Sequence, residues 1–175
     1  MVTGPQLETA RLTLRWFTHD DIGPFNELGT NPRVIRYVGN QPFASLEAAR
    51  ETLERAPLRD YATYGYGRFA CVWKHTGEVM GFCGPKFLAD SGEVDLGYRF
   101  LPAFWGRGLA TESSLAVIDY AREQLGLERL VGWVHPDNLP SARVLSKLGF
   151  SFERKAAFAD IPGIDFDLYT KRLDG

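Results

Sequence analysis

Apolar and polar residues alternate in several short runs of the chain, which predicts half-buried β-strands. The first run is Leu12–Trp16, and Phe69–Trp73 and Val79–Cys83 follow as a pair joined by the turn-forming residues Lys74–Glu78. A fourth run, Val94–Phe100, comes after another short turn. Because the connections among these later strands are short, we expect them to be antiparallel neighbours.

Two helices are expected between the first strand and the second. Thr18 can cap the start of one helix, which Pro24 should keep short or kinked. Ser45 can cap the other helix, and Pro57 is expected to stop it. The stretch 33–43 between them has no periodicity, so we predict a loop over one end of the sheet.

A helical pattern follows the fourth strand. Apolar and small residues recur at helical spacing from Gly108 to Leu125, and Leu130–Val134 is again typical of a strand. A strand, a helix and a strand in this order predict a parallel, right-handed crossover. Asn138 can then cap a last helix that carries Pro140 in its first turn.

The chain is expected to close with an antiparallel hairpin of Phe152–Phe158 and Ile164–Leu173, joined through Pro162-Gly163. Together these elements predict an α/β (α+β) fold. It has a mixed, mostly antiparallel twisted sheet of about seven strands, helices on both faces and one parallel strand–helix–strand crossover. No repeat or linker divides the chain, so residues 1–175 are expected to form a single domain.

Composition and charge exclude several classes of function. Hydrophobic residues make up 45% of the chain and the formal net charge is −2, which gives no electrostatic basis for binding nucleic acid or an anionic membrane. No apolar run approaches the roughly 20 residues that span a bilayer. Met1–Pro5 lacks the pattern of a signal peptide. We therefore expect a cytoplasmic protein without nucleic-acid or membrane partners, either a monomer or a homodimer.

The two cysteines, Cys71 and Cys83, are too few and too far apart for a metal-binding spacing, so no metal is expected. They fall in neighbouring predicted strands, which leaves a disulfide open, although a cytosolic chain would keep both as thiols. Packing in the core is the more usual role of a free cysteine.

A glycine-rich turn, Trp105-Gly106-Arg107-Gly108, leads directly into the long helix. Unpaired backbone N–H groups and the positive end of the helix dipole meet at such a turn, which makes it a ready site for phosphate. Gly-x-Gly alone is weak evidence for a phosphate site, because a tight strand-to-helix turn without a ligand has the same pattern. The chain has no Gly-Lys-Ser/Thr and no Rossmann spacing with its following acid, which argues against a nucleotide-binding loop.

Three blocks of sequence resemble the GNAT superfamily of acyl-CoA N-acyltransferases, nearest to its ribosomal-protein N-terminal acetyltransferase (RimJ/RimL-like) branch. The blocks are Leu7–Arg15, Leu96–Tyr98 with Trp105–Glu112, and Asn138–Phe150. Their order and spacing match the family over nearly the whole chain. The resemblance implies the GNAT fold and an acetyl-CoA-dependent N-acetyltransferase that acts on a primary amine and releases CoA.

The resemblance also implies where acetyl-CoA binds. Gly108 and Ala110 match the family's pyrophosphate loop, Gln/Arg-x-x-Gly-x-Gly/Ala, while Trp105 stands where Gln or Arg is usual. In the family, the residue at the position of Asn138 contacts the cofactor arm, and a nearby hydroxyl, here Ser141, can face the thioester sulfur. The residues expected to bind the cofactor are Leu96, Gly97, Tyr98, Trp105, Gly106, Arg107, Gly108, Leu109, Ala110, Thr111, Asn138, Ser141, Arg143 and Lys147.

In the family, the two parallel strands splay apart and the pantetheine arm lies between them, adding to their free edges. A glycine in each strand, Gly97 and Gly132, fits a close backbone approach, although both would also fit simple relief of packing. Arg107 could add charge at the rim of the loop or be an ordinary surface arginine. Arg143 and Lys147, four residues apart on a helix, could reach the phosphates of CoA.

Catalysis must proceed without the tyrosine acid that many members of the family carry, because Leu145 occupies its position. The leaving thiolate has a reference pKa of about 8.5, so its protonation gains little near neutrality, and a hydrogen bond from Ser141 can replace it. Glu93, Asp95 and His135 are the candidate bases. Surface carboxylates and a loop histidine without a catalytic role remain the plain alternatives.

Two functions follow. The first is direct transfer of an acetyl group to a primary amine, either a protein N-terminal α-amine or a small molecule such as an amino acid, a polyamine or an aminoglycoside. An α-amine near pKa 7.7–8.0 is easier to deprotonate than a lysine-like amine. The second is a catalytically inactive acyl-CoA-binding sensor or partner module. Acceptor choice is expected to lie in the early helices and in the loops 33–43 and 159–162.

Overall fold

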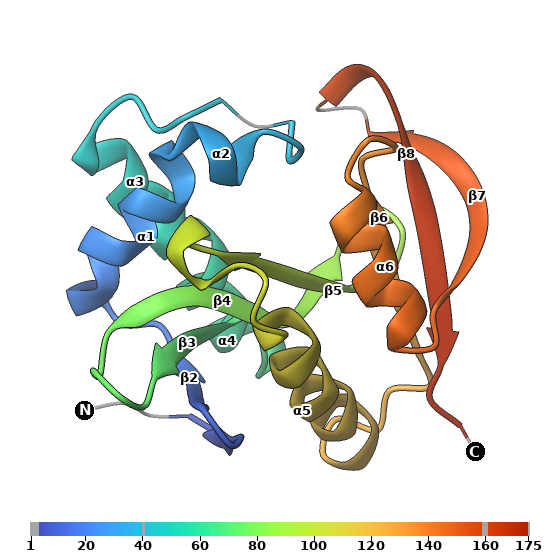
Figure 1. Ribbon diagram of the computed structural model, residues 1–175, viewed down its shortest axis with the longest axis horizontal. Helices are drawn as coiled ribbons and strands as arrows, with labels where there is room; N and C mark the ends of the chain where they lie inside the picture. Colours follow the sequence, from blue (N-terminus) through green and yellow to red (C-terminus); the bar gives the residue numbers. More distant parts are fainter. Residues whose placement is uncertain (1–3, 40, 159–160, 175) are drawn as a thin grey trace.

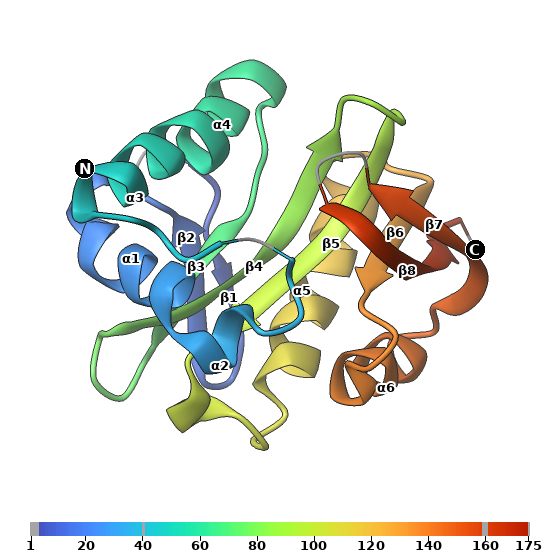
Figure 2. The same cartoon turned by 90° about the horizontal axis from the view of Figure 1, so that it is seen from above.

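The computed structural model describes residues 4–39, 41–158 and 161–174. One eight-stranded sheet, in the order β1-β2-β3-β4-β5-β6-β8-β7, crosses the molecule, and helices cover both of its faces (Figures 1 and 2). The strands are β1 (Leu7–Glu8), β2 (Leu12–Trp16), β3 (Phe69–Trp73), β4 (Val79–Leu88), β5 (Glu93–Phe100), β6 (Arg129–Val134), β7 (Ser151–Phe158) and β8 (Ile161–Arg172). The helices are α1 (Ile22–Thr30), α2 (Pro32–Ile35), α3 (Leu46–Leu53), α4 (Arg59–Tyr64), α5 (Leu109–Glu123) and α6 (Leu139–Lys147). Short helical turns are η1 (His19–Asp21), η2 (Glu54–Leu58) and η3 (Pro102–Phe104).

The alternation of side chains along β3 separates two hydrophobic cores. Phe69 and Cys71 pack with Val117 of α5 on one face of the sheet. Ala70, between them, packs with Phe25 of α1 on the other face. The predicted mixed sheet with helices on both faces is therefore confirmed, with one strand more than expected because β1 adds a two-residue edge. Among the described residues, no helix is long and apolar enough to cross a bilayer.

Pro57 does not end the second predicted helix. The chain passes from α3 through the π-helical turn η2, which contains Pro57, into α4, and it leaves the helix only at Gly65 (φ +77°). A π turn shifts the hydrogen-bond partners by one residue, so that the missing N–H of proline and its ring are accommodated. Pro57 is also fully buried, and its packing adds to this arrangement.

Part of the predicted loop 33–43 is helical. The short helix α2 begins after Asn31, whose side chain accepts a hydrogen bond from the N–H of Arg33 at 3.0 Å. Pro32 occupies its first position, where no N–H is required. The Asn31-Pro32 pair is therefore both the end of α1 and the start of the next helix.

The closing hairpin turns earlier than predicted. Pro162 and Gly163 lie inside β8, and the connection at residues 159–160 is outside the described residues. Ile161 pairs with Phe158 and Asp165 with Ala157, so the residues in between form a bulge. A bulge suits proline, which has no N–H to donate, and a glycine with φ of +86°.

The predicted parallel crossover joins β5 to β6 through α5, but the two strands meet only briefly. Asp95 pairs with Val131, and no further pair follows between the described residues of these strands. β5 is paired along its length with β4, and β6 with β8. The sheet therefore consists of two halves that diverge beyond Asp95, as both views show (Figures 1 and 2).

Candidate active site

A cavity of about 170 Å³ lies where β5 and β6 separate. From β5, Leu96 and Tyr98 face the side of the sheet that α5 and α6 cover, while Asp95, Gly97 and Arg99 face the α1–α4 side. The cavity is also lined by residues of both sides: Ser141 and Leu145 from α6, and Arg68, Phe82, Trp133 and Val38 from elsewhere. The opening in the sheet thus connects its two faces.

Two hydroxyl groups meet at the α6 end of this cavity. The Tyr98 hydroxyl lies 2.9 Å from Ser141 Oγ and also donates to the Ser141 carbonyl at 3.1 Å. Asn138 caps α6, and its Oδ1 accepts from the Ser141 N–H at 3.3 Å. Burial raises the pKa of Tyr98, so its hydroxyl stays protonated at neutral pH. The Tyr98 hydroxyl has one proton, which goes either to the Ser141 carbonyl or to Ser141 Oγ; when it goes to Oγ, the serine proton is available for an acceptor in the cavity.

Gly97 and Gly132, the two glycines inside strands β5 and β6, are required for different reasons. A Cβ on Gly132 would lie 2.8 Å from Leu145 Cδ1, so this glycine makes room for a leucine that is only 1% exposed. A Cβ on Gly97 would lie 3.4 Å from Asp95 Oδ2, which is an ordinary contact, and Gly97 lines the cavity. Packing against Leu145 explains Gly132, whereas Gly97, which has no side chain, leaves space in the cavity beside Asp95.

Of the three candidate bases, only Asp95 lines the cavity. Burial raises its pKa to about 6, although the nearby Arg68 charge and the backbone N–H of Trp133 act in the opposite direction. Glu93 is instead ion-paired with Arg129 at 3.2 Å at the far end of the strand. A carboxylate with a pKa near 6 is ionised at neutral pH and still basic enough to accept a proton.

His135 lies beside the site rather than in it. Its Nδ1 accepts a hydrogen bond from the backbone N–H of Asp137 at 3.1 Å. Its ring packs between those of Tyr37 and Phe166, with centroids 5.2 and 5.9 Å away. This environment orients the imidazole by aromatic contacts, in keeping with a structural loop histidine.

Sequence reasoning missed two arginines in the cavity. The guanidinium carbons of Arg68 and Arg99 lie 4.9 and 5.2 Å from the Phe82 ring centroid. Arg99 is the cross-strand partner of Phe82, and the backbone of Arg68 approaches closely because Gly84 lacks a Cβ. Burial lowers the pKa of both, that of Arg99 to about 10, so Arg99 remains charged at neutral pH. Arginine side chains in general keep their charge in proteins. Single arginines in or beside strands carry no motif, and only the register of β3, β4 and β5 brings them together.

The glycine-rich turn has the geometry of an anion site. Gly106 and Gly108 adopt φ of +73° and +76°, and Gly108 is the N-cap of α5. In the described part of the chain, no backbone or side-chain acceptor takes the N–H groups of Leu109, Ala110 and Thr111. These are the free donors that a phosphate would need. The N–H of Trp105, by contrast, donates to the Pro102 carbonyl at 3.1 Å.

The first sequence block holds this turn in place. Arg11 Nε lies 2.9 Å from Glu112 Oε1, and Arg11 Nη2 donates to the Arg107 carbonyl at 2.8 Å. Thr9 Oγ1 donates to the other carboxylate oxygen of Glu112 at 2.7 Å. The segment between β1 and β2 is thus tied to the first turn of α5, which gives a physical role to two blocks that are about 100 residues apart in sequence.

The other proposed phosphate contacts lie on the surface. The Arg107 guanidinium carbon lies 5.4 Å from the Phe104 ring and 6.0 Å from the Trp73 ring. Arg143 and Lys147 are exposed on α6. Their contact with CoA stays a prediction.

Both cysteines are core residues, as expected. Cys71 and Cys83 are free, fully buried thiols, and burial raises the pKa of each, that of Cys83 to about 11. A thiol with so high a pKa is a poor nucleophile at neutral pH. Within the described ranges, no three His, Cys, Asp or Glu side chains are grouped as metal ligands would be.

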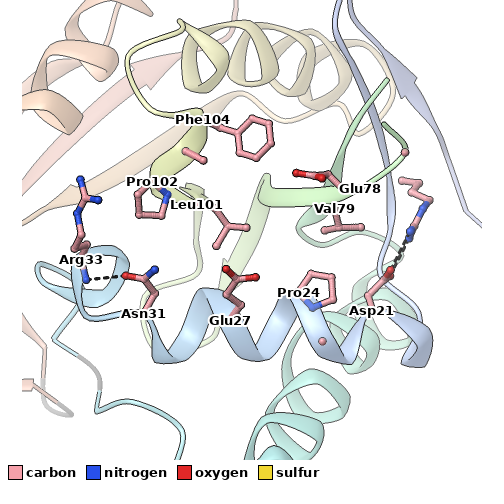
Figure 3. A pocket seen from close by; sticks show the side chains of 14 residues that line it. Asp21, Pro24, Glu27, Asn31, Arg33, Glu78, Val79, Leu101, Pro102 and Phe104 are labelled. Atoms are coloured by element: carbon pink, nitrogen blue, oxygen red, sulfur yellow. Dashed lines mark hydrogen bonds and ion pairs between the residues drawn. The ribbon is translucent and has the colours of Figure 1, made fainter. Parts of the chain in front are cut away.

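A larger hollow, of about 870 Å³, lies between α1, the β3–β4 turn and η3 (Figure 3). Its wall includes the ion pair of Arg15 with Asp21 at 2.8 Å and the exposed carboxylates of Glu27 and Glu78. It shares no lining residue with the cavity between β5 and β6. The smaller cavity is the better candidate site, because it joins the diverging strands to a carboxylate with a raised pKa and to paired hydroxyls.

Fold and site together are those of an acyltransferase. Residues 11–151 match the family described as acetyltransferase (GNAT) domain, and the chain belongs to this family. The p20 protein of Bacillus licheniformis, an uncharacterised N-acetyltransferase, is 33% identical over 149 residues, which cover 84% of this chain and 83% of p20. The chain is therefore a GNAT-type N-acetyltransferase, and the enzyme class inferred from the three sequence blocks is confirmed.

Solved structures agree on the fold. An acetyltransferase from Agrobacterium tumefaciens superposes with a TM-score of 0.82 at 28% identity, covering 98% of this chain and 96% of that one. Spermidine N-acetyltransferase from Vibrio cholerae, in complex with CoA and spermine, gives a TM-score of 0.77 at 17% identity over 94% of this chain and 96% of its own. At that identity the likeness supports the fold alone.

Proposed function

We propose that this enzyme transfers the acetyl group of acetyl-CoA directly to a primary amine, either a protein N-terminal α-amine or the amine of a small molecule. The observation that carries the proposal is the cavity between β5 and β6. It has paired hydroxyl groups at one end and a partly buried carboxylate with a raised pKa at the other. A site open to both faces of the sheet lets two substrates meet without a covalent enzyme intermediate.

The residues present fit acetyl-CoA. Free N–H groups at the start of α5 suit its pyrophosphate, with Gly106 and Gly108 supplying the turn. The edge of β5 beyond Asp95 faces β6 without strand pairing, which suits an arm that carries amide groups. When bound, acetyl-CoA supplies the activated acetyl thioester. The backbone of Leu96–Tyr98 and Ser141 then lie beside the cavity in which that group is expected.

Asp95 is the proposed base, which accepts a proton from the ammonium group of the acceptor, so that the neutral amine can attack the acetyl carbonyl and displace the CoA thiolate. Ser141, with its Oγ 2.9 Å from the Tyr98 hydroxyl, is the proposed hydrogen-bond donor to the leaving sulfur. A backbone N–H of Leu96–Tyr98 stabilises the negative charge on the acetyl oxygen. Tyr98 and Ser141 together do the work that a tyrosine at position 145 would do, while Leu145 fills the space against Gly132.

The RimJ/RimL-like branch assignment also belongs to this proposal. It is supported by the role of the Leu7–Arg15 block, in which Thr9 and Arg11 hold Glu112. The branch does not by itself fix the acceptor, and the monomer or homodimer expectation stays a prediction. The rival function, an inactive acyl-CoA-binding module, is favoured only by Leu145.

Release of free thiol from acetyl-CoA in the presence of a panel of primary amines tests the proposal. Calorimetric titration with acetyl-CoA, run in parallel, measures binding without turnover. We expect both binding and amine-dependent thiol release. Binding without release on any amine would favour the inactive module, and absence of binding would refute the proposed cofactor site.

A further inference from the structure

The α1–α4 end of the cavity carries an excess of positive charge. Arg68 and Arg99 line it, and both flank the ring of Phe82. Among the described residues that line the cavity, Asp95 is the only acidic one. Lys86, the cross-strand neighbour of Asp95, is already paired with Asp60 at 3.3 Å, so this second pair is electrically neutral. Two guanidinium groups therefore face one carboxylate.

Two hydrogen-bond donors at this end have no partner among the described residues. Arg68 Nε and Trp133 Nε1 are buried and unpaired, and both side chains line the cavity. The Arg99 guanidinium makes one long bond, from Nη1 to the Leu28 carbonyl at 3.4 Å. Buried donors normally have acceptors, so unpaired donors on two residues that line the cavity point to a ligand that brings acceptor oxygens.

The separation of these groups limits the ligand. A Cβ placed on Gly97 would lie 3.4 Å from Asp95 Oδ2 and 3.8 Å from Arg68 Cδ, so carboxylate and arginine are near neighbours on one wall. A cavity of about 170 Å³ admits a small group beside the acetyl group. The amine and the anionic group of the acceptor must therefore be close together in the molecule.

We infer that the acceptor is an amine with a carboxylate close to it, such as a free α-amino acid, whose carboxylate binds Arg68 and Trp133 while its amine faces Asp95. This inference rests on the proposed function and specifies its substrate class. A planar guanidinium and an indole N–H provide three directed donors for carboxylate oxygens. Polyamines and aminoglycosides bring further cations, which Arg68 and Arg99 would repel.

Matched pairs of acceptors test the inference. The thiol-release assay compares free amino acids with their carboxamides, which keep the amine and the side chain but lose the negative charge, and includes spermidine as a polycation. For the intact enzyme we expect kcat/KM to be about 10- to 100-fold higher for the carboxylates than for the carboxamides, as expected for charged hydrogen bonds. Equal or better use of carboxamides or of spermidine would overturn the inference while leaving the acetyltransferase activity intact.

Two variants locate the effect. Trp133→Phe keeps the aromatic ring and removes the unpaired N–H, so we expect a several-fold loss with carboxylate acceptors and a smaller loss with carboxamides, whose carbonyl oxygen is an uncharged acceptor. Arg68→Gln should lower the carboxylate preference to near one, with the KM for acetyl-CoA unchanged. Arg122→Gln on the exposed side of α5 makes the same charge change outside the cavity and is the control. A preference that survives both Trp133→Phe and Arg68→Gln would contradict the placement, and loss of acetyl-CoA binding in the intact enzyme would instead refute the proposed function.

Discussion

Replacing Asp95 with asparagine should make the enzyme more stable and much less active. Burial raises the pKa of this carboxyl from its ordinary value of 3.8 to about 6. The folded state thus prefers the protonated form, so ionisation costs stability as the pH rises from the unfolded pKa through the folded one. A rise of this size corresponds to about 3 kcal/mol at pH 8 and to about 1 kcal/mol at pH 4.5.

Asparagine resembles the neutral carboxyl in shape and removes the cost of the buried charge. Urea unfolding should therefore show Asp95→Asn to be more stable than the parent by up to about 3 kcal/mol at pH 8, with a smaller gain at pH 4.5. The favourable effect of the Arg68 and Lys86 charges on ionised Asp95 is already contained in the folded pKa of about 6.

Activity should change in the opposite direction. Loss of a general base typically lowers the rate by about 10²- to 10⁴-fold. In the parent enzyme, kcat/KM should fall about tenfold per pH unit below pH 6, in addition to the titration of the acceptor amine, and Asp95→Asn should lose this break. Glu93→Gln removes the other carboxylate on this face, which is paired with Arg129.

The reasoning fails if Asp95→Asn keeps its activity, or if Glu93→Gln abolishes the acidic break instead. A loss of activity together with a loss of stability would show that Asp95 is a structural partner of Arg68 rather than a base. Near-ultraviolet circular dichroism on each variant checks that the tertiary packing is unchanged.

Three further changes test other parts of the site. Gly108→Ala forces a side chain onto a backbone with φ of +76°, so we expect a loss of about 1 kcal/mol in unfolding free energy and weaker acetyl-CoA binding by calorimetry. Gly77→Ala, at φ of +80° in a distant turn, is the control: it should cost similar stability and leave binding unchanged. Glu112→Gln weakens the link to Arg11 and Thr9; the KM for acetyl-CoA should rise several-fold, and an unchanged KM would show that this link does not position the turn. Tyr98→Phe and Ser141→Ala should each lower kcat more than they raise KM, and the double variant should be less impaired than the product of the two, because the hydroxyls act as one unit; full additivity in kcat would contradict the proposed relay.

The sequence by itself determined the order of the elements and the glycine-rich turn before α5. Alternation gave β2 with its bounds, and Asn138 with Pro140 marked the start of α6, because these signals are local. The Gly106 and Gly108 turn was readable for the same reason: a positive φ and a helix start need glycine at fixed places. Pro57 shows where local signals fail: proline usually ends a helix, but here a π turn and burial of its ring keep the chain helical.

Only the tertiary structure decided which side chains meet at the reaction centre. Nothing near Arg68 in sequence predicts that it lies with Arg99 on Phe82, because that contact depends on the register of three strands. The same holds for Tyr98 and Ser141, which are 43 residues apart and meet only because β5 separates from β6 beneath α6. By sequence alone, Glu93 and Asp95 were equally good candidates for the base, because residues two apart lie on the same face of a strand. The fold distinguishes them: Asp95 lies near Arg68 in the cavity and has a raised pKa, whereas Glu93 forms an ion pair with Arg129. A pKa depends on the surroundings that the fold assembles, and these cannot be read from the sequence.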